Sequence, residues 1–228
     1  MKKLSDLILE KIDLRNFELS QSYYYNSLPL CVIDSIYSIG VKYESVKNVV
    51  SNFCEYENIQ KYRDSKNVLP KIQEQYKVSD FLRKFKSFDF KLLAEDVFRN
   101  KQRTSTRNGI LKSQAVVEFL GILYEQEIDT FQDLSKLNKN GEKKILAIKG
   151  QKSGISLQYF YMLAGSDELI KPDRMILRFL EENIKRKILI EETLEIFKET
   201  CKALHDDHSI IITPRELDNA IWNYQRNK

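Results

Sequence analysis

The sequence predicts an all-α protein, and two observations support that prediction. The 228 residues include only 7 Gly and 4 Pro, so turn-forming residues are too scarce for a sheet protein, whereas Leu, Ile, Lys and Glu are abundant. Apolar side chains recur at every third or fourth position along much of the chain, which is the period of a helix with one buried face. A chain of this length forms one large domain or two small lobes, and it is long enough to bury a sizeable core.

The expected helices are separated by polar connectors. Ser5 is the expected cap of a first helix that reaches Ile12, and Pro29 begins an apolar helix that ends at Gly40. Thr213 begins a capping sequence for the last helix. The other helices expected outside the central region are 43–56, 78–85, 88–98, 110–124, 129–137 and 190–204, with a loop at 61–70.

Residues 145–180 read as a helix, a glycine turn, a second helix, a short break and a third helix. Gly150 and Gly154 bracket a polar turn, since glycine adopts positive φ without steric cost. Apolar residues from Leu157 to Ala164 recur at i, i+3, i+4 and i+7, which indicates one buried helical face. Pro172 then fits the first turn of the third helix.

This arrangement resembles the HhH-GPD superfamily of DNA base-excision glycosylases, which have an endonuclease-III-like fold. The matching residues are Ile148-Lys149-Gly150 at the start of the hairpin and Lys171-Pro172-Asp173 before the third helix, with a weaker resemblance at 28–50 and 110–123. The resemblance implies two helical lobes, a helix-hairpin-helix motif and a cleft between the lobes. The implied lobes are residues 30–165, and residues 1–29 with 166–228.

The resemblance implies a DNA N-glycosylase in which Asp173 is the catalytic residue at the mouth of the cleft. Breaking a nucleobase–sugar bond develops positive charge on the sugar, which a fixed carboxylate stabilises once the base has left the duplex stack. Gly154 stands where some members have a catalytic Lys, so we expect a monofunctional enzyme. Lys152 replaces a usual second hairpin glycine, and Gly40 replaces a polar residue that often fills the gap left by the flipped base. From spacing alone, Asp173 is better explained as a first-turn acid that stabilises a helix N-terminus, and the resemblance reverses that preference.

The expected DNA contacts come from the hairpin and from the basic stretch 99–107. Backbone N–H groups and the dipole at the start of a helix hold phosphate, and neighbouring cations add charge. An ordinary helix–turn–helix corner and a solvated loop explain the same residues without DNA. The expected DNA-binding residues are Lys149, Gly150, Gln151, Lys152, Ser153, Gly154, Ser156, Arg103 and Arg107.

The residue types that bind metals give little support for a metal site. The three cysteines are scattered and odd in number, which suits a reducing cytosol and gives no zinc or iron–sulfur spacing. His205-Asp206-Asp207-His208 contains metal-ligand types, but such a run is more often a polar turn. We expect no metal site and no cofactor, apart from a monovalent cation that could bind at the hairpin.

Charge and hydropathy set the remaining expectations. A formal net charge of +4 is compatible with a nucleic-acid partner and equally with solubility alone. No apolar run approaches the length of a membrane span, so no membrane partner is expected. We expect a cytoplasmic monomer that binds double-stranded DNA and is associated with the nucleoid if the source is bacterial.

Two alternatives come from other classes: a non-catalytic helix-hairpin-helix DNA-binding module and a helical protein-interaction domain. The target base depends on pocket walls from distant segments, which the sequence does not specify.

Overall fold

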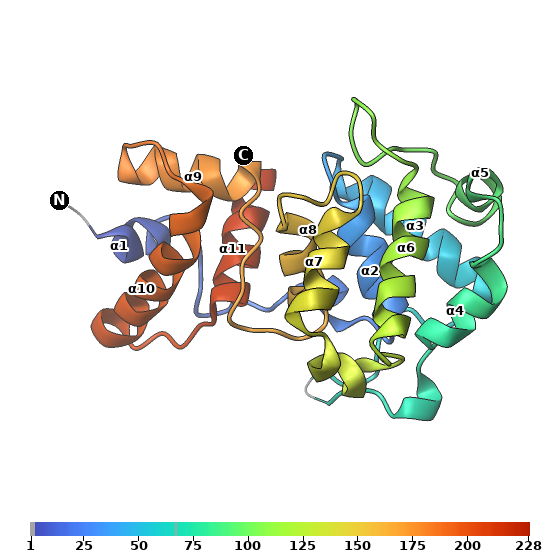
Figure 1. Cartoon of the computed structure of the whole chain (residues 1–228). Helices are drawn as coiled ribbons and strands as arrows, with labels where there is room; N and C mark the ends of the chain where they lie inside the picture. Colours follow the sequence, from blue (N-terminus) through green and yellow to red (C-terminus); the bar gives the residue numbers. More distant parts are fainter. Residues whose placement is uncertain (1–2, 67) are drawn as a thin grey trace. The chain divides into compact units, whose positions relative to one another are not determined.

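The computed structural model describes residues 3–66 and 68–228. Within those residues the regular secondary structure is helical, with two isolated β-bridges and no strand, so the predicted all-α class is confirmed. Internal contacts divide the chain into two compact units (Figure 1). We name Tyr24–Ala164 the hairpin unit, and Met1–Tyr23 with Gly165–Lys228 the terminal unit. No helix in the described part of the chain is long and apolar enough to cross a membrane.

The hairpin unit is built around helix α2 (Leu28–Tyr37), all of whose residues are buried. Its apolar run LPLCVI has no polar face, so the helix is stable only when neighbours cover every side. Helices α3, α6 and α8 pack against it (Figure 1). The other elements of this unit are α3 (Tyr43–Glu57), η2 (Ile72–Glu74), α4 (Val78–Phe85), α5 (Phe90–Leu92), η3 (Leu93–Val97), α6 (Lys112–Glu125), η4 (Phe131–Lys136), α7 (Lys139–Ala147) and α8 (Ile155–Leu163), with η1 (Gln21–Tyr24) at the boundary.

An aromatic cluster joins α3 to α4 and to the end of η3. The ring of Phe53 lies 5.7 Å from that of Phe81 and 5.8 Å from that of Phe98, centroid to centroid. The segment expected as one helix at 88–98 is instead a single α-turn followed by a π-helical turn. The wider turn is seen in the hydrogen bond from Phe98 N–H to the Leu93 carbonyl, five residues back.

The terminal unit packs four helices around one apolar core. These are α1 (Leu4–Leu9), α9 (Arg174–Ile184), α10 (Ile190–His208) and α11 (Pro214–Arg226). Phe179, Phe197 and Leu217 are buried at its centre. The capping sequence expected at Thr213 is confirmed, because its Oγ1 accepts from Glu216 N–H at 3.2 Å while the Glu216 carboxylate accepts from Thr213 N–H at 2.9 Å.

Four expected helix ends in this unit were wrong. Helix α1 has Lys3 at its N-cap and ends at Leu9, and Ser5 lies buried inside it. Helix α10 continues through His208, so the run at 205–208 is helical and not a turn. The reason is tertiary, since His208 Nε2 lies 3.0 Å from the Asp6 carboxylate of α1. Pro172 precedes the cap of α9 and is not in its first turn.

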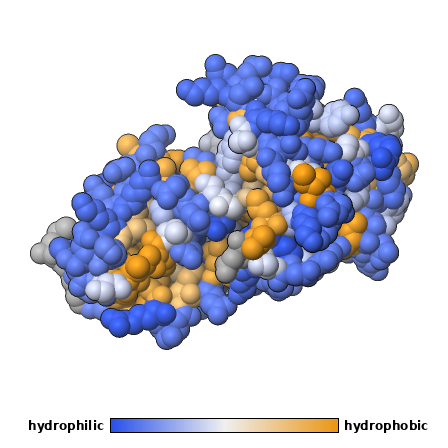
Figure 2. Space-filling model, turned by 90° about the horizontal axis from the view of Figure 1, so that it is seen from below, coloured by the Kyte–Doolittle hydropathy of each residue, from blue (hydrophilic) through white to orange (hydrophobic). Residues whose placement is uncertain are grey.

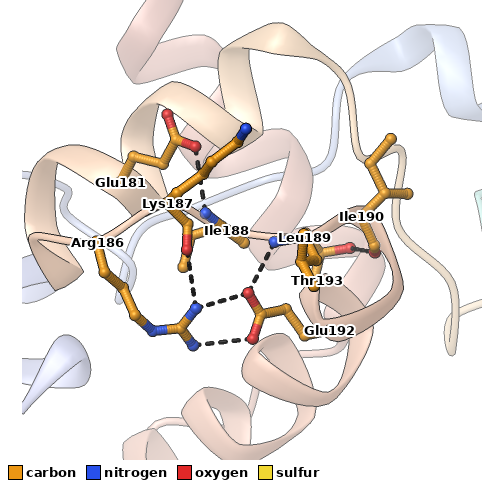
Figure 3. Close-up of polar contacts among 8 residues, drawn as sticks. All are labelled: Glu181, Arg186, Lys187, Ile188, Leu189, Ile190, Glu192 and Thr193. Atoms are coloured by element: carbon orange, nitrogen blue, oxygen red, sulfur yellow. Dashed lines mark hydrogen bonds and ion pairs between the residues drawn. The ribbon is translucent and has the colours of Figure 1, made fainter.

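The turn between α9 and α10 is held by a polar network around Glu192 (Figure 3). The two carboxylate oxygens accept from the Arg186 guanidinium at 2.7 and 2.9 Å, a bidentate pair. One of those oxygens also accepts from Leu189 N–H at 2.7 Å. These hydrogen bonds lower the pKa of Glu192 to about 2, and the bond from Arg186 makes the largest contribution. The same turn is tied to α9, because the Glu181 carboxylate accepts from Ile188 N–H at 3.2 Å.

Most of the surface in Figure 2 is hydrophilic, with several groups of exposed hydrophobic side chains. The largest exposed fractions among large apolar residues are 88% for Ile211 and 64% for Val68. Single exposed apolar residues are normal in a folded protein and do not identify a binding site.

Candidate functional site

The hairpin between α7 and α8 is a tight turn that needs two glycines. Gly150 has φ of +90° and Gly154 has φ of +75°, both in the left-handed region. Hydrogen bonds from Gln151 N–H to the Ile148 carbonyl at 2.9 Å and from Gly154 N–H to the Gln151 carbonyl at 3.0 Å close the turn. The predicted glycine-bracketed turn is therefore present in the form that the sequence indicated.

A buried polar pair holds this turn from inside. The Ser156 hydroxyl donates to Gln151 Oε1, and the two residues are only 4% and 1% exposed. Both were expected to contact DNA. Their burial means that their side chains are not available to a ligand at this surface.

The start of α8 presents backbone donors. Gly154, the N-cap, has no side chain to cap the helix. Among the described residues, no acceptor takes a hydrogen bond from the N–H groups of Ile155, Ser156 or Leu157. Such groups and the helix dipole together favour an anion at this position.

The basic stretch forms a closed loop beside α6. Thr104 N–H donates to the Ile110 carbonyl at 2.9 Å, and Lys112 N–H donates to the Gln102 carbonyl at the same distance. Arg103 Nη1 also donates across the loop to the Gly109 carbonyl at 2.7 Å. The tip of the loop, including Arg107, is exposed.

Gly150 packs directly against this loop. A Cβ atom added to Gly150 would lie 2.5 Å from Thr104 Cβ, closer than real side chains approach. Thr104 is 4% exposed, and its Oγ1 is buried with no hydrogen-bond partner among the described residues. This oxygen is of the type that a monovalent cation at the hairpin would take as a ligand. The hairpin turn and the basic loop therefore form one continuous surface, which we call the hairpin surface.

The cations of the hairpin surface differ from their neighbours in being unpaired. Among the described residues, Lys149, Lys152 and Arg107 have no ion-pair partner, and all three are exposed. In contrast, Arg99 lies 3.8 Å from the Glu55 carboxylate and Lys101 lies 2.6 Å from that of Glu95. Within the basic stretch, the charges of Arg99 and Lys101 are therefore engaged by carboxylates, whereas that of Arg107 is not. Ser153 is also exposed in the turn.

Lys112 is a residue of this site that sequence reasoning missed. It is 1% exposed, and its Nζ donates to the carbonyls of Tyr37 and Ile39 at 3.0 and 2.8 Å and to Gln102 Oε1 at 3.2 Å. The charge lies at the C-terminal end of α2, where the helix dipole favours a cation. Lys112 therefore anchors the base of the basic loop to the buried helix. No local signal distinguishes it from the many exposed lysines.

Asp173 lies in the terminal unit as the N-cap of α9. Its Oδ1 accepts from Met175 N–H at 2.8 Å and from Ile176 N–H at 3.2 Å. Its own N–H donates to the Lys171 carbonyl at 2.6 Å. Its Oδ2 makes no hydrogen bond with a described residue. The carboxylate is thus held by one oxygen and half-buried, while the other oxygen is unengaged.

A second carboxyl group lies close to Asp173. Asp218 of α11 is 2% exposed, and its Oδ1 accepts from Lys171 N–H at 2.9 Å. Burial is the main cause that raises the pKa of Asp218 well above its ordinary value, and the nearby charge of Asp173 raises it further. The hydrogen bond from Lys171 N–H and the charge of Lys171 act in the opposite direction. Sequence reasoning missed this residue, because Asp218 reads as one of many polar positions on an amphipathic helix.

The histidines do not form a metal site in the described part of the chain. His205 Nδ1 lies 3.1 Å from its neighbour Asp206, and His208 contacts Asp6. In residues 3–66 and 68–228, no three His, Cys, Asp or Glu side chains are grouped so that they could hold a metal ion.

Comparison with known proteins gives one match. The family model described as Domain of unknown function (DUF8548) matches residues 2–226. No curated protein and no solved structure is significantly similar to the chain.

The contact between Gly150 and Thr104 predicts a large effect of a single methyl group. Gly150→Ala should destabilise the protein by about 1–3 kcal/mol more than Gly40→Ala, because overpacking adds to backbone strain. Gly40 is the matched control, since it also has a left-handed φ of +66° but has open space where a Cβ would lie. Urea unfolding of both variants measures the difference. Equal losses of stability in the two variants would mean that the turn can move away from Thr104 without an energetic cost.

The buried Asp218 predicts a pH-dependent stability. Its pKa is raised from 3.8 on folding, so between pH 3.8 and the folded pKa the folded state binds more protons and stability falls as pH rises. The charged groups that face it are Asp173 and Lys171. Asp218→Asn does not titrate, so wild type should lose stability relative to this variant as pH rises from about 4 towards 7. Urea unfolding at a series of pH values checks this, and parallel curves would contradict it.

Proposed function

The chain belongs to the DUF8548 family, and we propose that it is a monofunctional DNA N-glycosylase. In this proposal the hairpin surface binds the phosphate backbone of duplex DNA. Asp173 then supports hydrolysis of the bond between a base and its sugar.

The packing of Gly150 on Thr104 is the observation on which the proposal rests. It joins the loop that carries exposed Arg107 to the turn that carries exposed Lys149 and Lys152. This turn leads into the first N–H groups of α8, which have no acceptor among the described residues. Phosphate is the ligand that suits both, because N–H groups at a helix start direct its oxygens while unpaired Lys and Arg neutralise its charge. Two neighbouring sources of such contacts suit a polyanion better than a single small anion.

The roles of the individual hairpin residues follow from their exposure. Lys149 and Lys152 contribute charge, and exposed Ser153 contributes a hydroxyl. Gly150 and Gly154 give the turn its shape through their positive φ. Gln151 and Ser156 act from inside, by fixing the turn.

The geometry of Asp173 suits stabilisation of a sugar cation. One carboxylate oxygen is held by two N–H groups of α9, so the side chain is fixed before a substrate arrives. The other oxygen is available to a developing positive charge or to a water molecule. A carboxylate that needs no rearrangement at the moment of reaction is the kind of group that lowers such a barrier.

The absence of a nucleophilic amine at residue 154 supports a monofunctional reaction. Gly154 has φ of +75°, a conformation that disfavours any residue with a side chain. A lysine that forms a Schiff base is therefore not expected at this point of the hairpin. Water is the proposed acceptor of the sugar.

A non-catalytic DNA-binding module is the second candidate, and one observation favours it. The hydrogen bonds of Asp173 Oδ1 are those of an ordinary N-cap, which explains the residue without any catalysis. Both candidates use the hairpin surface, so they differ only in the role of Asp173.

The first test addresses binding. If the hairpin surface holds phosphates, duplex affinity should fall steeply with rising salt, and Lys149→Glu with Lys152→Glu should reduce affinity by about tenfold or more at low salt. Fluorescence anisotropy with a labelled duplex measures both. The control is Lys198→Glu with Lys202→Glu on α10, which makes the same change in net charge at two exposed lysines elsewhere. Affinity that is independent of salt, or equal in the two double variants, would refute DNA binding by the hairpin.

The second test addresses catalysis. Asp173→Asn should lower the single-turnover rate of base release by about a hundredfold or more, because electrostatic stabilisation of this kind is worth on the order of 3 kcal/mol. Stability and duplex affinity should change little, since Asn caps helices as well as Asp does. A panel of duplexes with different damaged bases, scored for abasic sites, provides the substrate.

Asp89→Asn is the matched control for this second test. Asp89 is also an N-cap, whose Oδ1 accepts from Lys91 N–H and Leu92 N–H, and it should be neutral for base release. Base release that is unchanged in Asp173→Asn would leave Asp173 as a helix cap and favour the non-catalytic module. Trapping of a covalent adduct with borohydride in good yield would contradict the monofunctional assignment.

A further inference from the structure

The first turns of α11 carry a buried polar face. Arg215, Asp218 and Asn219 are 8%, 2% and 5% exposed. Their spacing of i, i+3 and i+4 places them on the same side of the helix. Three buried polar side chains in one place require partners, because an unpaired buried polar group is costly.

Two of these three side chains hold the segment that leads into α9. Arg215 Nη2 lies 2.6 Å from the Asp167 carboxylate, and Arg215 N–H donates to the Asp167 carbonyl at 3.1 Å. Asp218 Oδ1 accepts from Lys171 N–H at 2.9 Å. Asn219 has a different partner, since its Oδ1 accepts from the Ser20 hydroxyl at 2.8 Å and from Ser20 N–H at 3.2 Å.

Two hydrogen bonds connect Asp218 to Asp173 through the backbone of Lys171. Lys171 gives its N–H to Asp218, and its carbonyl accepts from Asp173 N–H at 2.6 Å. Asp173 then accepts from the N–H groups of Met175 and Ile176. The backbone of Asp173 is therefore fixed from the α11 side and its side chain from the α9 side.

We propose that Asp218 is a positioning residue for Asp173: by accepting from Lys171 N–H, it fixes the backbone that aims the Asp173 carboxylate. The structural part of this inference rests on the hydrogen bonds alone, and its consequence for catalysis rests on the proposed function. Asp218 does not itself contact the substrate in this scheme.

Three variants of the full chain separate this role from a general contribution to folding. Asp218→Leu removes the acceptor at nearly the same size, and Asp218→Asn keeps an acceptor oxygen. Asn219→Leu is the matched control, because it is the next residue on the same helix, is similarly buried, and loses a hydrogen bond to Ser20 instead of Lys171. If a Leu variant does not fold, Ala replaces Leu at both positions.

Amide hydrogen exchange tests the structural part without DNA. Asp218→Leu should speed exchange at the amides of Lys171 and Asp173 by about tenfold relative to Asn219→Leu, after correction for global stability. The reason is that local opening of this segment is easier when the hydrogen bond from Lys171 N–H to Asp218 is absent. Asp218→Asn should restore slow exchange. Equal exchange in the two Leu variants would overturn the inference.

Single-turnover base release and duplex affinity, measured on the same variants, test the catalytic part. We expect Asp218→Leu to reduce the rate by about tenfold or more with unchanged affinity, and Asp218→Asn to recover it. Faster exchange with an unchanged rate would overturn the positioning role and leave Asp218 as a structural anchor. If wild type releases no base from any duplex, the proposed enzyme fails and the catalytic part fails with it. The exchange result still decides whether Asp218 fixes Asp173, so the two failures are distinguishable.

Discussion

The contact between Gly150 and Thr104 is the constraint on which the hairpin surface depends. Because Gly150 has no Cβ and adopts a left-handed φ, the turn approaches the basic loop more closely than any other residue would permit. The close approach joins the loop that carries Arg107 to the turn that carries Lys149 and Lys152. Without it, the hairpin would be an ordinary corner and the loop an ordinary solvated connection, which is how the residues read when each segment is considered alone.

The same surface is stabilised by buried polar side chains that a ligand cannot contact. Lys112 ties the base of the loop to the carbonyls at the end of α2, and the pair of Gln151 and Ser156 fixes the turn. The hydrogen bonds of Lys112 Nζ and of the Ser156 hydroxyl have specific acceptors, so they favour one geometry over several similar ones. A preorganised surface of this type loses less entropy on binding a polyanion than a flexible basic loop does.

Asp173 shows how one residue can cap a helix and still keep a carboxylate oxygen unengaged. The oxygen that caps α9 accounts for its structural value, and the unengaged oxygen is what a reaction could use. The neighbouring Asp218 has a stability cost at neutral pH because burial raises its pKa. A carboxyl retained at such a cost beside a second carboxylate is characteristic of functional sites, although structural networks also contain such pairs.

The sequence by itself determined the helical class, the glycine turn of the hairpin, the capping of α11 by Thr213 and the range of α4, Val78–Phe85. Each of these follows from signals within one or two helical turns: apolar period, glycine conformation or a capping side chain. The tertiary structure decided which polar residues are buried and what they touch, including Lys112, Gln151, Thr104 and Asp218. It also decided the π-helical turn at Leu93–Val97 and the extension of α10 to His208. The physical reason is that buried Lys112 and Asp218 are satisfied by partners from segments distant in the sequence, and no local pattern specifies such partners.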